Sequence, residues 1–292
     1  MARLCVVGSV NMDMTCAVDA LPRPGQTVLA SSLHYAPGGK GGNQAVAAAR
    51  AGAQVQFIGA VGDDDKAAPL WAHLSDNGVG LDASVAVPGP SGTAIIVVDG
   101  HAENTIVVAP GANGLLTVSS AAARTVVERC EVLLTQLEIP VGTAVDAARQ
   151  AKTAGAVVMV NASPVGHDPG ALAELAELAD VVIANESEAE EWSWRPTFLV
   201  TTLGPRGARC VSAADEFWVP APSVKAVDTT GAGDVFAGVL AAHWPPGAGS
   251  RAEHLAALQR ACAAAALSTL VPGAGDCAPD ARAIDAAVSG AS

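Results

Sequence analysis

The chain has 292 residues, 50% of them hydrophobic and 3% aromatic, with a formal net charge of −13 and a pI near 4.7. These values argue against nucleic acid or an anionic membrane as a partner, because both repel negative charge. The longest apolar stretch, Ala261 to Val271, is too short to cross a bilayer and predicts a buried helix. We therefore expect a globular protein with neither nucleic acid nor membrane as a partner.

Short apolar runs rich in β-branched residues alternate with Ala-rich helical stretches along most of the chain. The expected strands are Leu4–Val7, Val55–Ile58, Val132–Thr135, Val157–Val160, Val181–Ala184 and Phe198–Thr202. The expected helices are Gln44–Arg50, Ala67–Asp76, Thr143–Ala154, Leu172–Leu178, Gly233–His243 and Arg251–Leu270. This alternation predicts an α/β fold with a mostly parallel sheet and helices on both faces, in a single domain that spans residues 1–292.

Two segments interrupt the alternation. Residues 15–35 are rich in Pro and turn residues, and Ala94–Val98 and Thr105–Val108 form an expected hairpin across Asp99-Gly100. We expect these segments to form a small β lid inserted into the large domain, within about residues 12–37 and 92–110.

The cysteines and histidines predict no metal site from their spacing. The six cysteines are scattered without a Cys-x-x-Cys pair, and most lie in apolar contexts. This pattern is typical of reduced thiols in the core of a cytoplasmic protein. The N-terminus reads as a strand and not as a signal peptide, which also favours a cytoplasmic location. The six histidines are expected on the surface or in loops.

The segment DTTGAGD, from Asp228 to Asp234, leads directly into an apolar run that predicts a helix. Its small residues allow backbone N–H groups to approach a ligand closely, and a helix N-terminus directs such groups toward negative charge. An acid at this position is compatible with the helix dipole and can accept a proton from a substrate hydroxyl. The segment therefore predicts an anion site with a general base inside it, as phosphoryl transfer to an alcohol requires.

The segment GGKGGNQ, from Gly38 to Gln44, precedes an Ala-rich helix. Lys40 can contact a phosphate or a hydroxyl, and Asn43 offers both a donor and an acceptor. Taken alone, the segment is only a Gly-rich loop before a helix. It is not a P-loop, which needs Gly-Lys followed by Ser or Thr, and the single glycine after the first strand makes no dinucleotide fingerprint.

Polar residues also follow several expected strands. Asn11 and Asp13, two residues apart, can point to one side of an extended segment and together bind vicinal hydroxyls. Glu138, Asn185 and Glu188 lie at later strand ends, where ligands bind in open α/β sheets. Each also has a plainer interpretation, as a solvated turn, a surface acid or, for Asn185, a helix N-cap.

Taken together, these motifs resemble those of the ribokinase subfamily of the PfkB carbohydrate kinases over nearly the whole chain. GGKGGNQAVAAARAGAQVQFIGAVGDD is similar to the family's N-terminal signature, and DTTGAGDVFAG to its C-terminal one. The segments GSVNMD, PGAN, QLE, NESEAE and TLGPRG resemble family segments in the same order. The resemblance implies a three-layer αβα sandwich of the ribokinase type, the use of ATP and Mg²⁺, activation by K⁺, and a homodimer formed through the lid.

The resemblance also implies a role for each matching residue. Asp234 would be the general base, and the N–H groups of Gly231, Ala232 and Gly233 would form the anion hole. The sugar pocket would comprise Asn11, Asp13, Gly39, Lys40, Asn43, Glu138 and Asp234. The nucleotide would lie beside Asn185, Thr202, Gly204, Arg206, Gly207, Gly233 and Cys262. Glu188 would hold Mg²⁺ through water, and the monovalent-cation site would comprise Asp228, Thr230, Ser268, Val271, Gly273 and Cys277.

The chain departs from the family pattern in four places, one of which, a Val239 bulkier than the usual small residue, should cause only local repacking. Only thirteen residues, 189–201, separate Glu188 from Thr202, where the family usually has a further helix and loop. We therefore expect Trp192 and Trp194 to be exposed or refolded there. Cys262 stands where Asn or His is usual near the purine. Cys277 stands where Ser commonly contributes to the cation site, which makes K⁺ dependence less secure than kinase activity.

The expected function is ATP-dependent phosphorylation of D-ribose at O5 to give ribose 5-phosphate. Related kinases that act on 2-deoxyribose, fructose or a nucleoside are alternatives, because only a few pocket side chains, such as Met12 and Asn43, distinguish these substrates. A homologue that binds sugar without turnover is an alternative of another class, and the intact DTTGAGD segment argues against it. A Rossmann dehydrogenase is disfavoured because the glycine fingerprint is missing.

Overall fold

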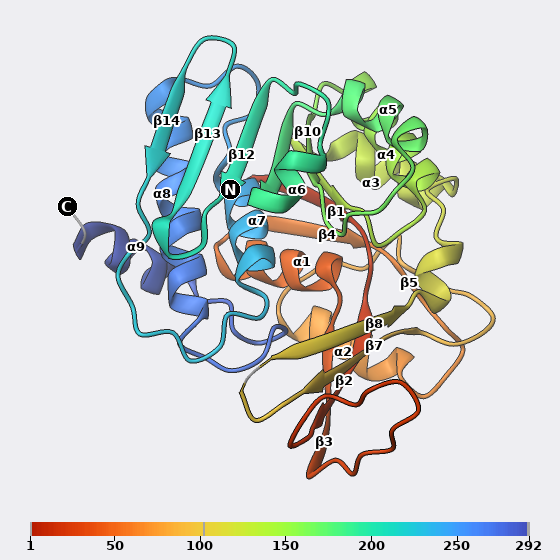
Figure 1. Ribbon diagram of the computed structural model, residues 1–292. Helices are drawn as coiled ribbons and strands as arrows, with labels where there is room; N and C mark the ends of the chain where they lie inside the picture. The colour runs from red at the N-terminus through yellow and green to blue at the C-terminus, as the bar shows by residue number, and fades with distance from the viewer. Residues whose placement is uncertain (1, 102, 291–292) are drawn as a thin grey trace.

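A mixed eight-stranded sheet forms the centre of the molecule (Figure 1). The computed structural model describes residues 2–101 and 103–290. The strands of this sheet are β1 (Arg3–Val7), β4 (Gln54–Ile58), β9 (Val132–Gln136), β10 (Val157–Asn161), β11 (Val181–Asn185), β12 (Phe198–Thr202), β13 (Ala208–Ser212) and β14 (Glu216–Val219). Their order is β14-β13-β12-β11-β10-β9-β1-β4, and only the pairings β12–β13 and β13–β14 are antiparallel.

Helices cover both faces of the central sheet. One face packs against α1 (Lys40–Arg50), α2 (Ala67–Asp76), α7 (Ala232–His243), α8 (Arg251–Ser268) and α9 (Ala281–Gly290). The other face packs against α3 (Ala121–Arg129), α4 (Val141–Thr153), α5 (Pro169–Leu178) and α6 (Glu186–Glu191). Side chains alternate between the two cores: Leu4 and Val6 of β1 join the first, and Cys5 joins the second. The predicted three-layer αβα fold with a mostly parallel sheet is confirmed.

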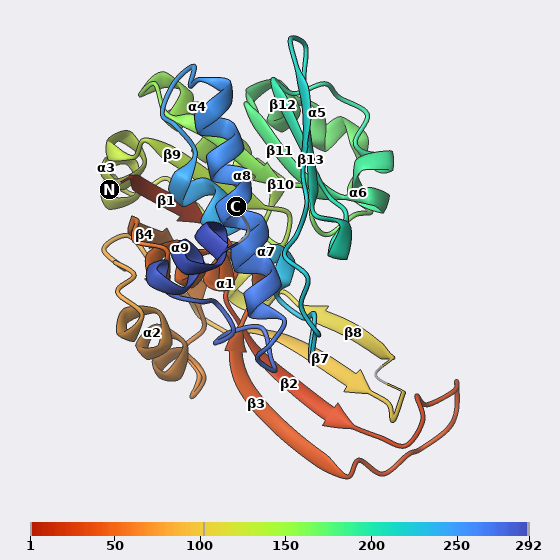
Figure 2. The same ribbon diagram turned by 90° about the vertical axis from the view of Figure 1, so that its left-hand side faces the viewer.

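A second sheet projects from the central one as an arm (Figures 1 and 2). Its strands are β2 (Asn11–Ala17), β3 (Ser32–Gly38), β7 (Gly92–Val98) and β8 (Asn104–Ala109), in the order β3-β2-β7-β8. We call it the lid sheet. The short elements β5 (Ala60–Val61), β6 (Val85–Ala86) and η1 (Gly111–Leu115) connect it to the body, and η2 (Gly204–Arg206) follows β12.

Two helices, α1 and α7, have glycine at the N-cap position. The side chains of Ser120, Asp168, Asn185 and Ser250 cap α3, α5, α6 and α8. By contrast, the N-caps of α1 and α7 are Gly39 and Gly231, which have no side chain to cap the helix, and α2 and α4 also lack a side-chain cap. The first N–H groups of a helix have no partner within the helix. In α1, the N–H groups of Lys40, Gly41 and Gly42 donate to Glu138 and Ser9, whereas the start of α7 has no capping side chain. Both helices begin in the segments that predicted a ligand site.

Some expectations need correction. The antiparallel hairpin β13–β14 was not among the predicted strands, although it extends the sheet at its edge. Trp192 is buried, at 8% exposure, and packs edge-on against the partly buried Trp194 with ring centroids 5.3 Å apart. Trp192 is therefore not an exposed side chain. His254 is also buried, between Trp244 and Phe198, and is not a surface residue.

Among the described helices, none combines the length and apolar character that a membrane span needs.

The six cysteines are unpaired, as expected from their scattered positions. Cys5, Cys210, Cys262 and Cys277 are buried, and Cys16 and Cys130 are partly buried. Burial raises the pKa of the Cys210 thiol to about 12, so this thiol is neutral and unreactive at physiological pH.

Candidate active site

Asp234 is a buried carboxylate in the first turn of α7, with an exposure of 8%. Both of its oxygens accept hydrogen bonds from α1. Asn43 Nδ2 donates to Oδ2 at 3.0 Å, and Gln44 Nε2 donates to Oδ1 at 3.0 Å. Because α1 and α7 pack together, the carboxylate is held in one orientation. It lies away from solvent, in a position that suits a base prepared for proton transfer.

The turn before Asp234 is braced by the loop that follows α8. Asp228 Oδ1 accepts hydrogen bonds from Thr230 N at 2.9 Å and Thr230 Oγ1 at 2.7 Å, and Asp228 Oδ2 accepts one from Gly273 N at 2.9 Å. Partial burial raises the pKa of Asp228, but these hydrogen bonds outweigh that effect and lower it. The ionised carboxylate therefore ties the two loops together beside the start of α7.

Gly231 is the N-cap of α7 and has a φ of +79°. A Cβ atom added there would lie 2.8 Å from Ala274 Cα, so the turn leaves no room for a side chain. The next residues, Ala232 and Gly233, begin the helix with N–H groups that lack intrahelical partners, although Ala232 N makes a long 3.3 Å contact with Thr229 O. This geometry is compatible with an anion hole, and the role of these three residues stays a prediction.

Lys40 lies at the start of α1 among three acidic side chains. Burial lowers the pKa of Lys40, but the charges of Asp234, Glu138 and Glu188 outweigh it and the net shift is upward. Lys40 is therefore a cation at physiological pH. Its positive charge lies within electrostatic range of Asp234 on α7 and of Glu188 on α6.

Glu138 follows β9 and is connected to the Gly-rich start of α1. Its Oε2 atom accepts hydrogen bonds from Ser9 Oγ at 2.6 Å and from Lys40 N at 3.3 Å. Ser9 Oγ in turn accepts one from Gly41 N at 3.3 Å. The loops after β1 and β9 are thus joined to the first turn of α1, at the carboxyl ends of neighbouring parallel strands.

Asp13 brings the lid sheet to the same cluster. Burial raises the pKa of the Asp13 carboxyl to about 7, with further contributions from the charges of Glu138 and Asp234. A Cβ added to Gly38, two residues before Lys40, would lie 2.1 Å from Asp13 Oδ2, so this carboxyl lies beside the start of α1. The structure therefore assembles Asp13, Lys40, Asn43, Glu138 and Asp234, which come from β2, α1, the loop after β9, and α7.

We expect Asp13→Asn to stabilise the free protein above pH 7. A carboxyl whose pKa is about 7 when folded, against about 3.9 when unfolded, makes the folded chain bind more protons between these values. Stability therefore falls as the pH rises from about 4 to about 7. Each pKa unit corresponds to about 1.4 kcal/mol. Allowing for the partial exposure of Asp13, we expect a gain of about 2 kcal/mol at pH 8 and almost none at pH 4.

Thermal unfolding at pH 4, 6 and 8 measures this difference, with the exposed Asp65→Asn as the matched control. A gain of about 2 kcal/mol corresponds to roughly 4–8 °C in Tm for a chain somewhat smaller than this one. A gain that is the same at all three pH values would contradict the explanation.

Asn11 is held by a residue to which the sequence assigned no role. Asn113 Nδ2 donates to Asn11 Oδ1 at 2.8 Å and to Val10 O at 3.1 Å, and Asn113 Oδ1 accepts from Val10 N at 3.0 Å. Asn113 belongs to the PGAN segment, which is the only signal that could have identified it. Ser9 and Gln44 were also missed. Both lie inside segments that the motifs did include, but nothing in the motifs shows which neighbour touches which acid.

The residues predicted to border a nucleotide lie at the carboxyl ends of β11 and β12. Asn185 and Thr202 are register partners on these strands. Asn185 caps α6 through a reciprocal pair with Glu188, whose Oε2 accepts from Asn185 N at 2.8 Å. Thus the N-cap interpretation of Asn185 is confirmed. Gly204 and Arg206 form η2, and Arg206 pairs with Glu186 at 2.6 Å, which connects the turn after β12 to α6.

Cys262 lies deeper than the other predicted nucleotide residues. It is 3% exposed, and its thiol contacts Val219 O at 3.8 Å. Burial raises its pKa to about 12. Gly207 is nearby, because a Cβ added to Gly207 would lie 2.0 Å from the same Val219 O. Cys262 therefore lies against the turn that carries Gly207, as a neutral thiol in the core.

The remaining predicted cation residues surround the loop after α8. Val271 N donates to Ser268 O at 3.2 Å, and Ser268 itself is buried at 1% exposure. The Cys277 thiol contacts Ala274 O at 3.3 Å and Thr230 O at 4.0 Å. Burial raises the pKa of Cys277, so it is a neutral thiol and not a thiolate ligand. The described residues contain no group of three or more His, Cys, Asp or Glu side chains that could hold a metal ion.

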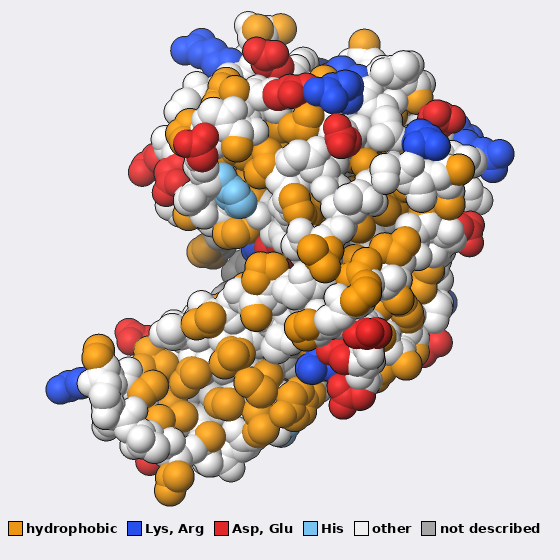
Figure 3. All heavy atoms as spheres, turned by 90° about the vertical axis from the view of Figure 1, so that its right-hand side faces the viewer, with side chains coloured by type: hydrophobic (Ala, Val, Ile, Leu, Met, Phe, Trp, Pro, Cys, Tyr) orange, Lys and Arg blue, Asp and Glu red, His pale blue; other side chains and the backbone are white. Residues whose placement is uncertain are grey.

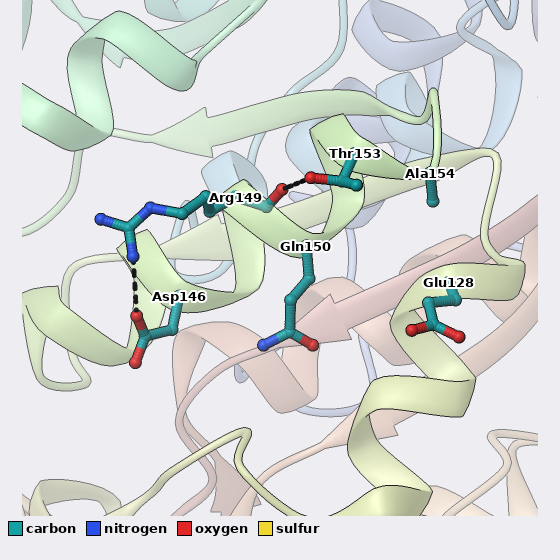
Figure 4. A pocket seen from close by; sticks show the side chains of 6 residues that line it. All are labelled: Glu128, Asp146, Arg149, Gln150, Thr153 and Ala154. Carbon is teal, nitrogen blue, oxygen red and sulfur yellow. Dashed lines mark hydrogen bonds and ion pairs between the residues drawn. The ribbon is translucent and has the colours of Figure 1, made fainter.

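A pocket of about 470 Å³ lies elsewhere, between α3 and the second half of α4. It is lined by Glu128, Asp146, Arg149, Gln150, Thr153 and Ala154 (Figure 4). Arg149 is already paired with Asp146 and with Glu174. None of the predicted site residues lines this pocket, so it is separate from the cluster around Asp234.

Comparisons with known proteins agree with the cluster of motifs. Residues 1–281 match the family described as pfkB family carbohydrate kinase. The ribokinase of Bacillus subtilis (strain 168) is 37% identical over 248 residues, which cover 81% of this chain and 83% of that protein. The deoxyribokinase of Salmonella typhi is 32% identical over 266 residues, covering 82% and 85%. The structure of Arabidopsis thaliana ribokinase complexed with ribose and ATP superimposes with a TM-score of 0.87 at 28% identity, covering 98% of both chains.

Proposed function

Because the chain belongs to the pfkB family of carbohydrate kinases, we propose that it transfers the γ-phosphoryl group of ATP to the O5 hydroxyl of D-ribose. One observation carries the chemistry: the buried Asp234 carboxylate lies at the uncapped start of α7, with both oxygens held by α1. We propose ribose as the substrate because several of the similar proteins are ribokinases, including one whose structure was solved in complex with ribose and ATP.

The sugar would bind between the lid sheet and α1. An ionised carboxylate accepts hydrogen bonds from two hydroxyl groups, and a neighbouring amide adds a donor and an acceptor. Asp13, Asn11 and Asn43 supply these groups, while Lys40 and Glu138 complete the polar wall. Closure of the lid sheet over the sugar would exclude water and so suppress hydrolysis of ATP.

In the transfer step, Asp234 takes the proton of the O5 hydroxyl as that oxygen forms a bond to the γ-phosphorus. The bond between this phosphorus and the bridging oxygen breaks, and its electron pair stays on ADP. The N–H groups of Gly231, Ala232 and Gly233 stabilise the charge on the migrating group. Lys40 adds a cation on the sugar side, and Asn185, Thr202, Gly204, Arg206 and Gly207 border the nucleotide.

The residues present fit Mg²⁺ and a monovalent cation, and we include both in the proposal. Glu188 uses one oxygen to cap α6, which leaves the other for a water-mediated contact with Mg²⁺, an ion that keeps much of its hydration shell. When bound, Mg²⁺ would neutralise phosphate charge. K⁺ prefers carbonyl and carboxylate oxygens. The Asp228 carboxylate and the carbonyls of residues 268–273 provide such oxygens, whereas the neutral Cys277 thiol adds little.

A coupled assay of ATP consumption over ribose, 2-deoxyribose, fructose and adenosine tests the proposal. We expect ribose to have the highest kcat/KM. A site built to bind a hydroxyl group discriminates in kcat/KM against the analogue that lacks it, by more than about tenfold. We therefore expect a lower kcat/KM for 2-deoxyribose. A higher kcat/KM for another substrate would contradict ribose. Calorimetric sugar binding without ADP formation would instead indicate a protein that only binds sugar.

Deoxyribokinase activity is the second candidate, because the Salmonella typhi deoxyribokinase is 32% identical. The 2-hydroxyl of ribose is the one group that separates the two substrates. If Asp13 receives that hydroxyl, Asp13→Asn should narrow the preference for ribose over 2-deoxyribose.

We also propose that two chains associate through the lid sheet. Tyr35, Met14, Ile95 and Val107 are register partners across its four strands, so they share one face. Tyr35 is 60% exposed, Val107 59% and Ile95 37%. Figure 3 shows hydrophobic side chains gathered over the projecting arm. Such contiguous apolar patches are uncommon on monomers, and a self-complementary patch favours a two-fold dimer.

We expect Val107→Glu to convert a dimer of 29.0 kDa chains into a monomer, because a charge in the apolar face would be buried without a partner. Light scattering coupled to size exclusion measures the molar mass. The matched control is Val165→Glu, since Val165 is 45% exposed and lies outside the lid sheet. A wild-type mass of one chain, or a Val107→Glu variant that stays dimeric, would rule out this interface.

A further inference from the structure

Gln44 is a polar side chain with no exposed surface, next to the proposed base. Its exposure is 0%, and its Nε2 atom donates to Asp234 Oδ1 at 3.0 Å. An ionised carboxylate only accepts hydrogen bonds, so the amide must present its NH₂ group to Asp234. Its oxygen, Oε1, has no hydrogen-bond partner among residues 2–101 and 103–290. The hydrogen bond to Asp234 therefore determines the orientation of the Gln44 amide.

The two helices leave Gln44 little freedom to move. A Cβ atom added to Gly238 of α7 would lie 2.3 Å from Gln44 O, so the two backbones are in close contact there. Gly238 is four residues after Asp234, which places it one turn further along the same face of α7. The backbone contact and the side-chain hydrogen bond together fix the distance between Gln44 and Asp234.

The two Asp234 oxygens have unlike neighbours. Oδ1 meets Gln44, which is fully buried, whereas Oδ2 meets Asn43, which is 5% exposed and belongs to the predicted sugar pocket. Asn43 can exchange its contact with Oδ2 for one with a sugar, because its amide has two hydrogens and an oxygen. Gln44 has no route to a substrate.

We propose that Gln44 is a positioning residue that fixes Asp234 through Oδ1 and leaves Oδ2 to accept the proton of the substrate hydroxyl. This inference rests on the proposed function. The hydrogen bond stops rotation of the carboxylate about its terminal torsion, which is otherwise broad and roughly two-fold. Oδ2 then stays aimed at the sugar when Asn43 turns to the substrate. Correct placement of a reacting group is worth much of the rate, and a misplacement of 1 Å can cost about 10²-fold.

Two substitutions separate positioning from packing. Gln44→Met keeps the volume and removes the donor, and we expect kcat to fall about 10–100-fold with the sugar KM within about twofold. Gln44→Glu keeps the shape and polarity but sets a second acid against Asp234, so it should lose more than Gln44→Met. A packing role predicts the reverse order, because Glu is the closer isostere. That reverse order would overturn the proposal.

A double variant provides the second criterion. If Gln44 acts through Asp234, Gln44→Met should cause no further loss of kcat in an Asp234→Asn background. A full additional loss there would show a general structural defect. The matched control is Gln56→Met, because Gln56 Nε2 also donates to a carboxylate, Asp82 Oδ2 at 3.1 Å, on the remote edge strand β4. This control should keep the wild-type kcat.

The wild-type substrate panel shows first whether the proposed function holds, and the kinetic comparison then uses the sugar with the highest kcat/KM. Crystal structures of the wild type and Gln44→Met provide a readout without turnover. We expect the Asp234 carboxylate to rotate or to adopt alternate conformers in the variant. An unchanged carboxylate would overturn the role of Gln44 even if no sugar were phosphorylated.

Discussion

Replacing Asp234 by Asn should lower kcat by about 10²–10⁴-fold, the range typical of a positioned general base. Asn cannot take the hydroxyl proton, although it occupies nearly the same volume between α1 and α7. The sugar should still bind, because Asp13, Asn11 and Asn43 are unchanged. Steady-state kinetics and calorimetric titration with ribose measure the two effects separately, and their divergence distinguishes a base from a binding residue.

The control for this substitution is Asp65→Asn, since the Asp65 side chain is 96% exposed and pairs with Lys66 at 3.9 Å. It should leave kcat unchanged. Some loss of stability is expected for Asp234→Asn, because an amide has one acceptor oxygen for two donors, Asn43 and Gln44. A variant that keeps more than a tenth of the wild-type rate, about 1.4 kcal/mol in activation free energy, would remove Asp234 from the role of base.

Gly231→Ala should lower kcat by about 10²–10³-fold, the loss typical of one displaced oxyanion donor. The added Cβ would lie 2.8 Å from Ala274 Cα, a backbone atom that cannot simply turn aside. The turn between Asp228 and α7 must therefore shift, and with it the N–H groups that would hold the migrating phosphoryl group. The sugar KM should change little, because the sugar contacts come from other segments.

Gly247→Ala is a closely matched control. Gly247 has the same φ of +79° as Gly231, but a Cβ added to it meets nothing within 4 Å. Both variants should lose about 1 kcal/mol of stability from the strain of a non-glycine residue at positive φ, and Gly231→Ala should lose more because its Cβ also meets Ala274. Only Gly231→Ala should lose kcat. Equal kcat values in the two variants would mean that the turn at Gly231 does not position the reacting group.

The uncapped helices explain why these two substitutions should be so costly. Ser, Asp or Asn side chains cap α3, α5, α6 and α8, whereas the N-caps of α1 and α7 are Gly39 and Gly231. A capping side chain would occupy the N–H groups that an anion needs. The start of α7 thus lacks the stabilisation of a cap, and a change that displaces its N–H groups should act directly on the proposed reaction.

The parallel strands of the central sheet could be predicted from the sequence, because a buried parallel strand needs a largely apolar run, and β1, β4 and β9 to β12 all have one. The sequence also located Asp234, since a helix start of Gly, Ala, Gly and Asp is a local chemical property of neighbouring residues. The antiparallel hairpin β13–β14 escaped prediction because its strands are short and partly exposed at the sheet edge, where apolar runs are not required.

The contacts between distant residues could not be predicted from the sequence and depend on the fold. Gln44, Ser9 and Asn113 hold Asp234, Glu138 and Asn11 across separations of more than 100 residues, and no local pattern records such pairings. Burial likewise appeared only in the fold. The raised pKa of Asp13 and the enclosed Trp192 both depend on distant segments that exclude water. The sequence shows which residue types are present, whereas packing sets the distances between them and their exposure to solvent. The strength of every electrostatic interaction depends on that distance and that exposure.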